Sequence, residues 1–108
     1  MGGGATKFNK DEDLAQDEEV AKIHALLQGK WSVGKDGFGN ETFYTLEGWK
    51  LTQSGGMSGS MNCYLTKDKK GNIRLGWGGS KGMTIQEGYT ETEVAWKFMG
   101  ASQTWKKV

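Results

Sequence analysis

The sequence predicts a mainly β protein: an antiparallel up-and-down meander of about seven to eight short strands, preceded by one N-terminal amphipathic helix. From residue 31 onward, apolar and polar residues alternate in short runs, which is the period of a half-buried strand. Eighteen glycines separate these runs and the chain has no proline. A turn at roughly every tenth residue favours sequential hairpins, so we expect a small barrel or a strongly curved sheet.

The chain of 108 residues is long enough for one domain and too short for two. We expect a flexible tail over residues 1–8 and a single domain over 9–108, with the helix at 9–29 and the meander at 30–108. The formal net charge is only +1. A nucleic-acid-binding domain usually carries a clustered basic stripe, so we expect no nucleic-acid partner.

The first residues match the N-myristoylation pattern, with Gly2 as the acceptor after removal of Met1 and Thr6 at the required position. A glycine-rich start is equally typical of a flexible tail or a cloning remnant, and both interpretations stay open. One myristoyl chain binds membranes only weakly, and the segment that follows is acidic. A lipid on Gly2 therefore predicts weak or partner-dependent membrane contact.

Residues 9–29 have the pattern of an amphipathic helix. Asn9 followed by Glu12 resembles a capping box, and Gly29 is a suitable stop. The apolar stripe, which we expect to dock on the β-region, consists of Val20, Ile23 and Leu27. His24 adjoins it without a second metal ligand in reach, so we expect a packed or surface histidine.

Period-two alternation places the strands at 31–34, 41–46, 49–53, 60–66, 72–77, 83–87, 92–98 and 103–107. Several runs have a clear inward set, such as Met61, Cys63 and Leu65. Cys63 is the only cysteine, which excludes an intrachain disulfide and a cysteine-built zinc site. We expect a small buried side chain there and not a reactive thiol.

Five tryptophans are many for so small a core. The alternation predicts that Trp31, Trp77 and Trp96 are core residues. Trp49 and Trp105 are the candidates for exposed aromatic residues. An exposed tryptophan near a loop would favour binding of sugar, peptide or protein.

In an up-and-down meander, alternate connections lie at the same end. The loops 34–40, 54–59, 78–82 and 99–102 should therefore share one rim, whose candidate binding residues are Lys35, Phe38, Met57 and Lys81. Glycine-freed backbone amides with two lysines are able to meet an anionic group. Short hairpins need glycine in any case, and turn chemistry is the favoured explanation.

Gly29-Lys30-Trp31 resembles the G-x-W that opens the first strand of calycin barrels, the lipocalin and fatty-acid-binding group. The resemblance implies that the tryptophan closes one end of a barrel and packs against a basic residue near the last strand, a place that Lys106 or Lys107 would fill. The rhythm of glycine turns and tryptophan strands over residues 29–108 also resembles small glycine- and tryptophan-rich β-modules of algal protists.

The chain contains no nucleophile elbow, Walker loop or metal-ligand spacing, so we expect no enzyme, no metal and no cofactor. The leading hypothesis is a non-catalytic binding or interaction module, attached to a protein partner or larger assembly and tethered reversibly through Gly2. The alternative is a small calycin-like carrier of an apolar ligand. An enzymatic interpretation requires ionisable residues that converge only in the fold. No apolar segment approaches membrane-spanning length, so we expect an intracellular, cytoplasmic protein with peripheral membrane contact.

Overall fold

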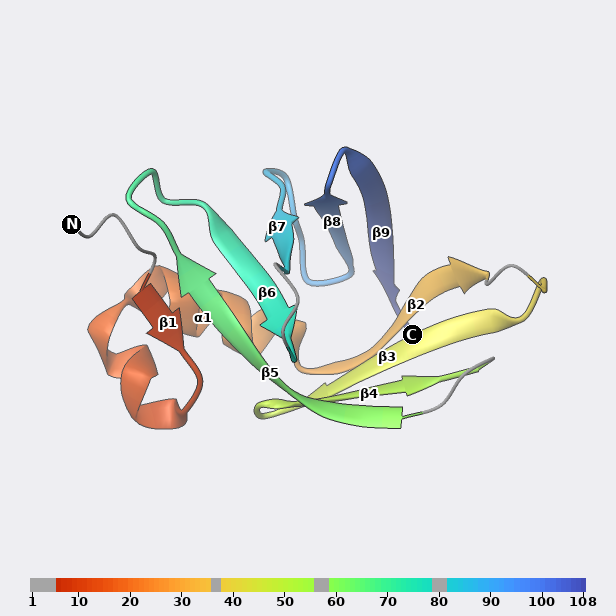
Figure 1. Ribbon diagram of the computed structural model, residues 1–108, viewed down its shortest axis with the longest axis horizontal. Coiled ribbons are helices and arrows are strands. Elements are labelled where there is room, and N and C mark those ends of the chain that lie inside the picture. Colours follow the sequence, from red (N-terminus) through yellow and green to blue (C-terminus); the bar gives the residue numbers. More distant parts are fainter. Residues whose placement is uncertain (1–5, 36–37, 56–58, 79–81) are drawn as a thin grey trace.

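The computed structural model describes residues 6–35, 38–55, 59–78 and 82–108 (Figure 1). These residues form one nine-stranded antiparallel sheet, a 3-10 helix η1 and an α-helix α1. The elements, in chain order, are β1 Thr6–Phe8, η1 Asp11–Gln16, α1 Glu18–Leu27, β2 Gly29–Lys35, β3 Glu41–Glu47, β4 Lys50–Ser54, β5 Gly59–Lys67, β6 Ile73–Trp77, β7 Met83–Ile85, β8 Glu93–Phe98 and β9 Ala101–Lys107.

Strands β2 to β9 each pair with the next one along the chain, and β9 returns to pair with β2. The return contact matches Trp31 with Lys107 and Ser32 with Lys106. Strands β2 to β9 therefore form a closed eight-stranded barrel. Of the two predicted forms, a small barrel or a strongly curved sheet, the small barrel is confirmed. Each expected strand lies within two residues of an observed one.

Strand β1 is an addition that the alternation did not predict. It pairs with β5, with Thr6 opposite Lys67 and Phe8 opposite Leu65. The Phe8 side chain is buried in the common core. The prediction of a flexible tail is therefore wrong for residues 6–8, because this one apolar side chain ties the segment to the barrel. Residues 1–5, with Gly2, lie outside the described residues.

The helical segment is divided in two, whereas the sequence predicts one helix over residues 9–29. The carboxylate of Asp17 accepts hydrogen bonds from the backbone N–H groups of Glu19 and Val20, at 3.0 and 3.2 Å. Asp17 is therefore the N-cap of α1, in an extended conformation that interrupts the helix. The expected cap at Asn9 is wrong, although its backbone N–H donates to Asp13. No helix in the described ranges is long and apolar enough to cross a bilayer.

Helix α1 lies across one end of the barrel, next to the turns β3–β4 and β5–β6 (Figure 1). Its apolar stripe of Val20, Ile23 and Leu27 is buried in the same core cluster as the barrel side chains. His24 Nε2 is 2.8 Å from the carbonyl oxygen of Gly48 in the β3–β4 turn. Lys67, the last residue of β5, contacts Asp17 at 2.9 Å. These contacts hold the helix against this end of the barrel.

The barrel interior contains a group of packed tryptophans. Trp31, Trp96 and Trp105 are all fully buried, and the Trp105 ring centroid lies 5.0 Å from that of Trp96 and 6.2 Å from that of Trp31. The prediction of an exposed Trp105 is wrong. The pleat of β9 turns Trp105 inward opposite Val94, and its polar neighbours take the outer face.

Candidate functional site

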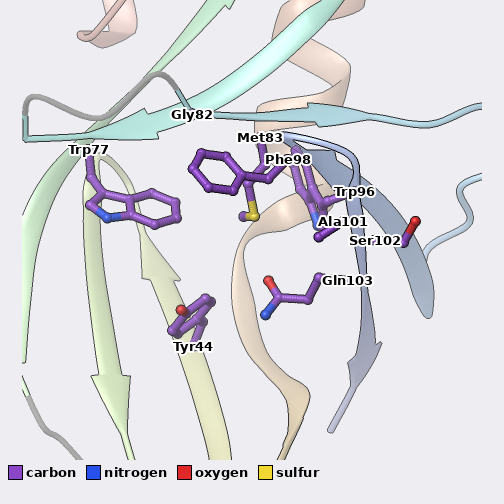
Figure 2. A pocket seen from close by; sticks show the side chains of 9 residues that line it. All are labelled: Tyr44, Trp77, Gly82, Met83, Trp96, Phe98, Ala101, Ser102 and Gln103. Atoms are coloured by element: carbon purple, nitrogen blue, oxygen red, sulfur yellow. The ribbon is translucent and has the colours of Figure 1, made fainter. Parts of the chain in front are cut away.

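A pocket of about 430 Å³ lies at the barrel end opposite the helix (Figure 2). This volume is within the range of small-molecule sites, about 300–1,000 Å³. Strands β3, β6, β7, β8 and β9 contribute its wall. The lining residues are Tyr44, Trp77, Gly82, Met83, Trp96, Phe98, Ala101, Ser102 and Gln103.

The β8–β9 hairpin forms one side of the pocket as a ladder of opposed inward side chains. Val94 faces Trp105 at the buried bottom, Trp96 faces Gln103 above it, and Phe98 faces Ala101 at the mouth. Trp96 is fully buried, whereas Phe98 is 40% exposed. The depth of the pocket therefore follows directly from strand alternation on these two strands.

Tyr44 and Trp77 form the facing side. Their rings meet edge to face, with centroids 6.3 Å apart and an interplanar angle of 68°. Tyr44 also contacts Trp105 edge to face, at 5.3 Å and 75°. Figure 2 shows these aromatic rings, with Met83 and Phe98, bordering one common space. The rings therefore pack against each other and give the pocket an apolar wall.

Two side chains in this wall, Gln103 and Trp96, have N–H groups without a hydrogen-bond partner in the described residues. Trp105 Nε1 donates a hydrogen bond of 2.9 Å to Oε1 of Gln103. The indole N–H is only a donor, so the carboxamide oxygen of Gln103 must face Trp105. The amide Nε2 has no protein partner in the described chain. Trp96 Nε1 is buried and likewise without a partner there.

The pocket wall carries no ionised side chain among the lining residues that the structure describes. Burial raises the pKa of the Tyr44 phenol above its ordinary value, because the phenolate would lose solvation. Tyr44 is therefore a neutral phenol at physiological pH. The lining offers apolar area, the amide of Gln103 and the hydroxyl groups of Tyr44 and Ser102, which both donate and accept, without charge.

Of the predicted rim residues, Lys35 and Phe38 belong to the barrel end that holds the pocket, but neither lines it. Lys35 ends β2 at the barrel end that holds the pocket, and Phe38 follows in the same connection with 93% of its surface exposed. Met57 and Lys81 fall outside the described residues. The predicted grouping of alternate connections at one end agrees with the pairing order.

Trp49 belongs to the other end, in the β3–β4 turn. It is partly buried, and its ring stacks on His24 with centroids 4.2 Å apart and planes 27° from parallel. Its indole N–H donates to Asp11, at 3.0 Å. The contacts of His24 and Trp49 thus hold the helices against the barrel, and the two residues have a structural role there.

Cys63 lies in the wall of a second hollow, of about 630 Å³, with a mixed polar lining that includes Lys7, Asn9 and Asn62. Burial raises the pKa of its thiol to about 11, so the sulfur stays protonated at neutral pH. This agrees with the expected buried, unreactive cysteine. Within the described ranges, no three His, Cys, Asp or Glu side chains gather as a possible metal site.

Tyr44 and Gln103 are pocket residues that the sequence did not single out. For Tyr44 a signal was available, because Thr42, Tyr44 and Leu46 alternate along an expected strand. Gln103 precedes Trp105 by two residues and therefore shares its face. A polar residue between two polar neighbours gives no alternation, so its inward orientation was not evident.

Lys107 Nζ lies 4.6 Å from the centroid of the Trp31 ring and donates to the carbonyl of Gln28. This is the contact that the calycin resemblance implies for the tryptophan of the first strand. The resemblance itself remains a prediction. No protein-family model, curated protein or solved structure matches this chain.

Proposed function

We propose that this protein is a non-catalytic carrier that binds a small, flat, apolar ligand in the open end of its barrel. The observation that supports the proposal is the 430 Å³ pocket between the Tyr44–Trp77 pair and the β8–β9 hairpin. Four of its nine lining residues are aromatic, and the ring of Trp105 packs against two of them, Tyr44 and Trp96. Flat rings suit such walls, because aromatic groups stack or meet edge to face at little conformational cost.

The architecture also favours a carrier over a surface-binding module. The helix covers one end of the barrel with its apolar side chains in the core cluster, and the pocket lies at the opposite end. A tricyclic hydrocarbon has about 13 heavy atoms. At about 0.5 kcal/mol per atom, inside the range observed for small ligands, the binding free energy is about 7 kcal/mol. This corresponds to a Kd of about 10 μM.

Equilibrium dialysis with trace fluorene, a flat tricyclic hydrocarbon, tests the proposal with the protein in excess. Ala101→Trp places an indole in the mouth, because Ala101 points inward opposite Phe98. We expect this variant to weaken fluorene binding more than tenfold. Thr104→Trp is the matched control on the same strand, since Thr104 is exposed on the outer face.

The control should change the affinity less than twofold. Absence of saturable fluorene binding to the native protein would contradict the proposal. Equal binding by the Ala101→Trp and Thr104→Trp variants would also contradict it, because the ligand would then bind elsewhere.

A second candidate function is attachment to a protein partner. The observation in its favour is that two large apolar side chains, Phe38 and Met99, are 93% and 81% exposed at connections of the open end. Gel filtration of protein from its native source should show a larger species, which Phe38→Ser with Met99→Ser dissociates. A lone monomer would count against this function.

A further inference from the structure

The carboxamide of Gln103 presents a donor to the pocket in a defined orientation. Its oxygen is held by Trp105 Nε1 at 2.9 Å, and Trp105 is itself fully buried among rings. A rotation of the amide by 180° would place two N–H groups against an indole N–H and is therefore unfavourable. The Nε2 group remains on the pocket side without a protein partner in the described residues.

Trp96 provides an independent second observation. It stands directly opposite Gln103 on the β8–β9 hairpin and lines the same pocket. Its Nε1 is the buried side-chain polar atom without a partner in the described part of the chain. Buried donors in native proteins are nearly always paired, so this unpaired indole N–H adds to the donor character of the wall. Because the atom is closed off from the empty pocket, an acceptor reaches it only if the Trp96 ring shifts.

Both groups are donors, and no cation among the described lining residues would balance an anion. An ionised carboxylate would lose its hydration in this apolar wall without a charged partner, which disfavours binding. A carbonyl oxygen or a ring nitrogen accepts the same hydrogen bonds at a much smaller desolvation cost. Figure 2 shows Gln103 and Trp96 on one side of the space that Tyr44 and Trp77 border on the other.

We infer that the ligand is an uncharged planar ring compound with a hydrogen-bond acceptor, which pairs with Gln103 Nε2. This inference rests on the proposed carrier function. It adds the chemical class: an aromatic ketone or a heteroaromatic compound with an acceptor nitrogen, and neither a hydrocarbon nor an acid.

Three tricyclic probes of almost equal shape test the inference by equilibrium dialysis on the native protein. Fluorenone carries a carbonyl acceptor, fluorene carries no polar group, and carbazole carries an N–H donor. We expect fluorenone to bind about tenfold more tightly than fluorene, because it satisfies a donor that is otherwise left in an apolar wall. Carbazole, whose N–H has only a hydroxyl oxygen such as that of Tyr44 to donate to, should bind less tightly than fluorenone.

Gln103→Glu is an isosteric variant that keeps an oxygen for Trp105 and removes the amide donors. At alkaline pH, which keeps the introduced carboxyl group ionised, we expect the order of affinities to reverse, with carbazole now above fluorenone, because the carboxylate accepts from its N–H. The ratio of two ligands on one protein cancels any general loss of pocket shape. Gln103→Leu should abolish the discrimination among the three probes.

Equal affinities of fluorene and fluorenone for the native protein would overturn this inference and leave the carrier function standing. An unchanged fluorenone preference in the Gln103→Glu variant would overturn the role of Gln103. If none of the three probes binds, the carrier function fails and the inference fails with it.

Discussion

Replacement of Trp105 by Phe tests the claim that this residue is the centre of the core and not a surface aromatic group. Trp105 is fully buried, contacts the rings of Trp31, Trp96 and Tyr44, and donates to Gln103. The smaller ring leaves a void of about 40 Å³, which at about 24 cal/mol per Å³ costs about 1 kcal/mol. Loss of the hydrogen bond to Gln103 costs about 1 kcal/mol more.

We therefore expect Trp105→Phe to lower the free energy of unfolding by about 2 kcal/mol. Trp49→Phe is the matched control, because it makes the same chemical change at a partly buried position whose N–H bonds an exposed carboxylate. The control should cost less than about 1 kcal/mol. Urea denaturation followed by circular dichroism measures both values.

At about 4 °C per kcal/mol for a domain of this size, the melting temperatures of the two variants should differ by at least about 4 °C. Equal losses in the two variants, or a larger loss for Trp49→Phe, would refute the assignment of Trp105 to the core. Urea m-values close to that of the native protein would show that the denatured state is comparable in all three proteins.

Three further predictions concern other parts of the barrel. Asp17→Asn should keep the helix cap but lose the ion pair with Lys67. That pair lowers the pKa of Asp17 in the folded protein. The native protein should therefore be more stable than the variant at neutral pH, and the difference should vanish as acid protonates this carboxylate. A pH series of urea melts measures this, and a constant difference between the two proteins would contradict it. Gly82→Ala should destabilise the protein more than Gly34→Ala. Both glycines have positive φ, but only a Cβ at Gly82 would clash, at 2.7 Å from the Leu75 carbonyl oxygen. Thermal melting compares the two variants, and equal losses of stability would contradict the backbone clash. Cys63 should react with a disulfide reagent only as fast as the barrel opens, because its thiol is buried with a pKa of about 11; rapid labelling of the folded protein would refute this.

The strands were predictable from the sequence because local chemistry determines them. Alternation and turn glycines predicted 60–66, and the observed β5 is Gly59–Lys67. The helix was harder to place, since Asn9 and Asp17 are both good caps and their competition depends on tertiary contacts. Lys67, fifty residues further along the chain, favours Asp17 by pairing with its carboxylate.

The candidate site was predictable only in part. The alternation correctly predicted that Trp77 and Met83 face the interior. The predicted strand order also correctly placed alternate connections at the barrel end that holds the pocket. The alternation did not reveal that a pocket lies at the barrel end opposite the helix. That outcome depends on which end the helix covers, and on the inward pleat of β9, whose polar residues conceal the alternation.

Closure of the barrel by two register pairs between β2 and β9 has a consequence for how the protein folds. The neighbouring hairpins join residues that are close along the chain, whereas this seam joins the first barrel strand to the last. The loss of chain entropy on bringing β2 and β9 together precedes the favourable contacts between them. The hairpins should therefore form first and the barrel should close late. The cation–π contact between Lys107 and Trp31 therefore forms late in folding. A substitution that weakens this contact should slow refolding less than it speeds unfolding.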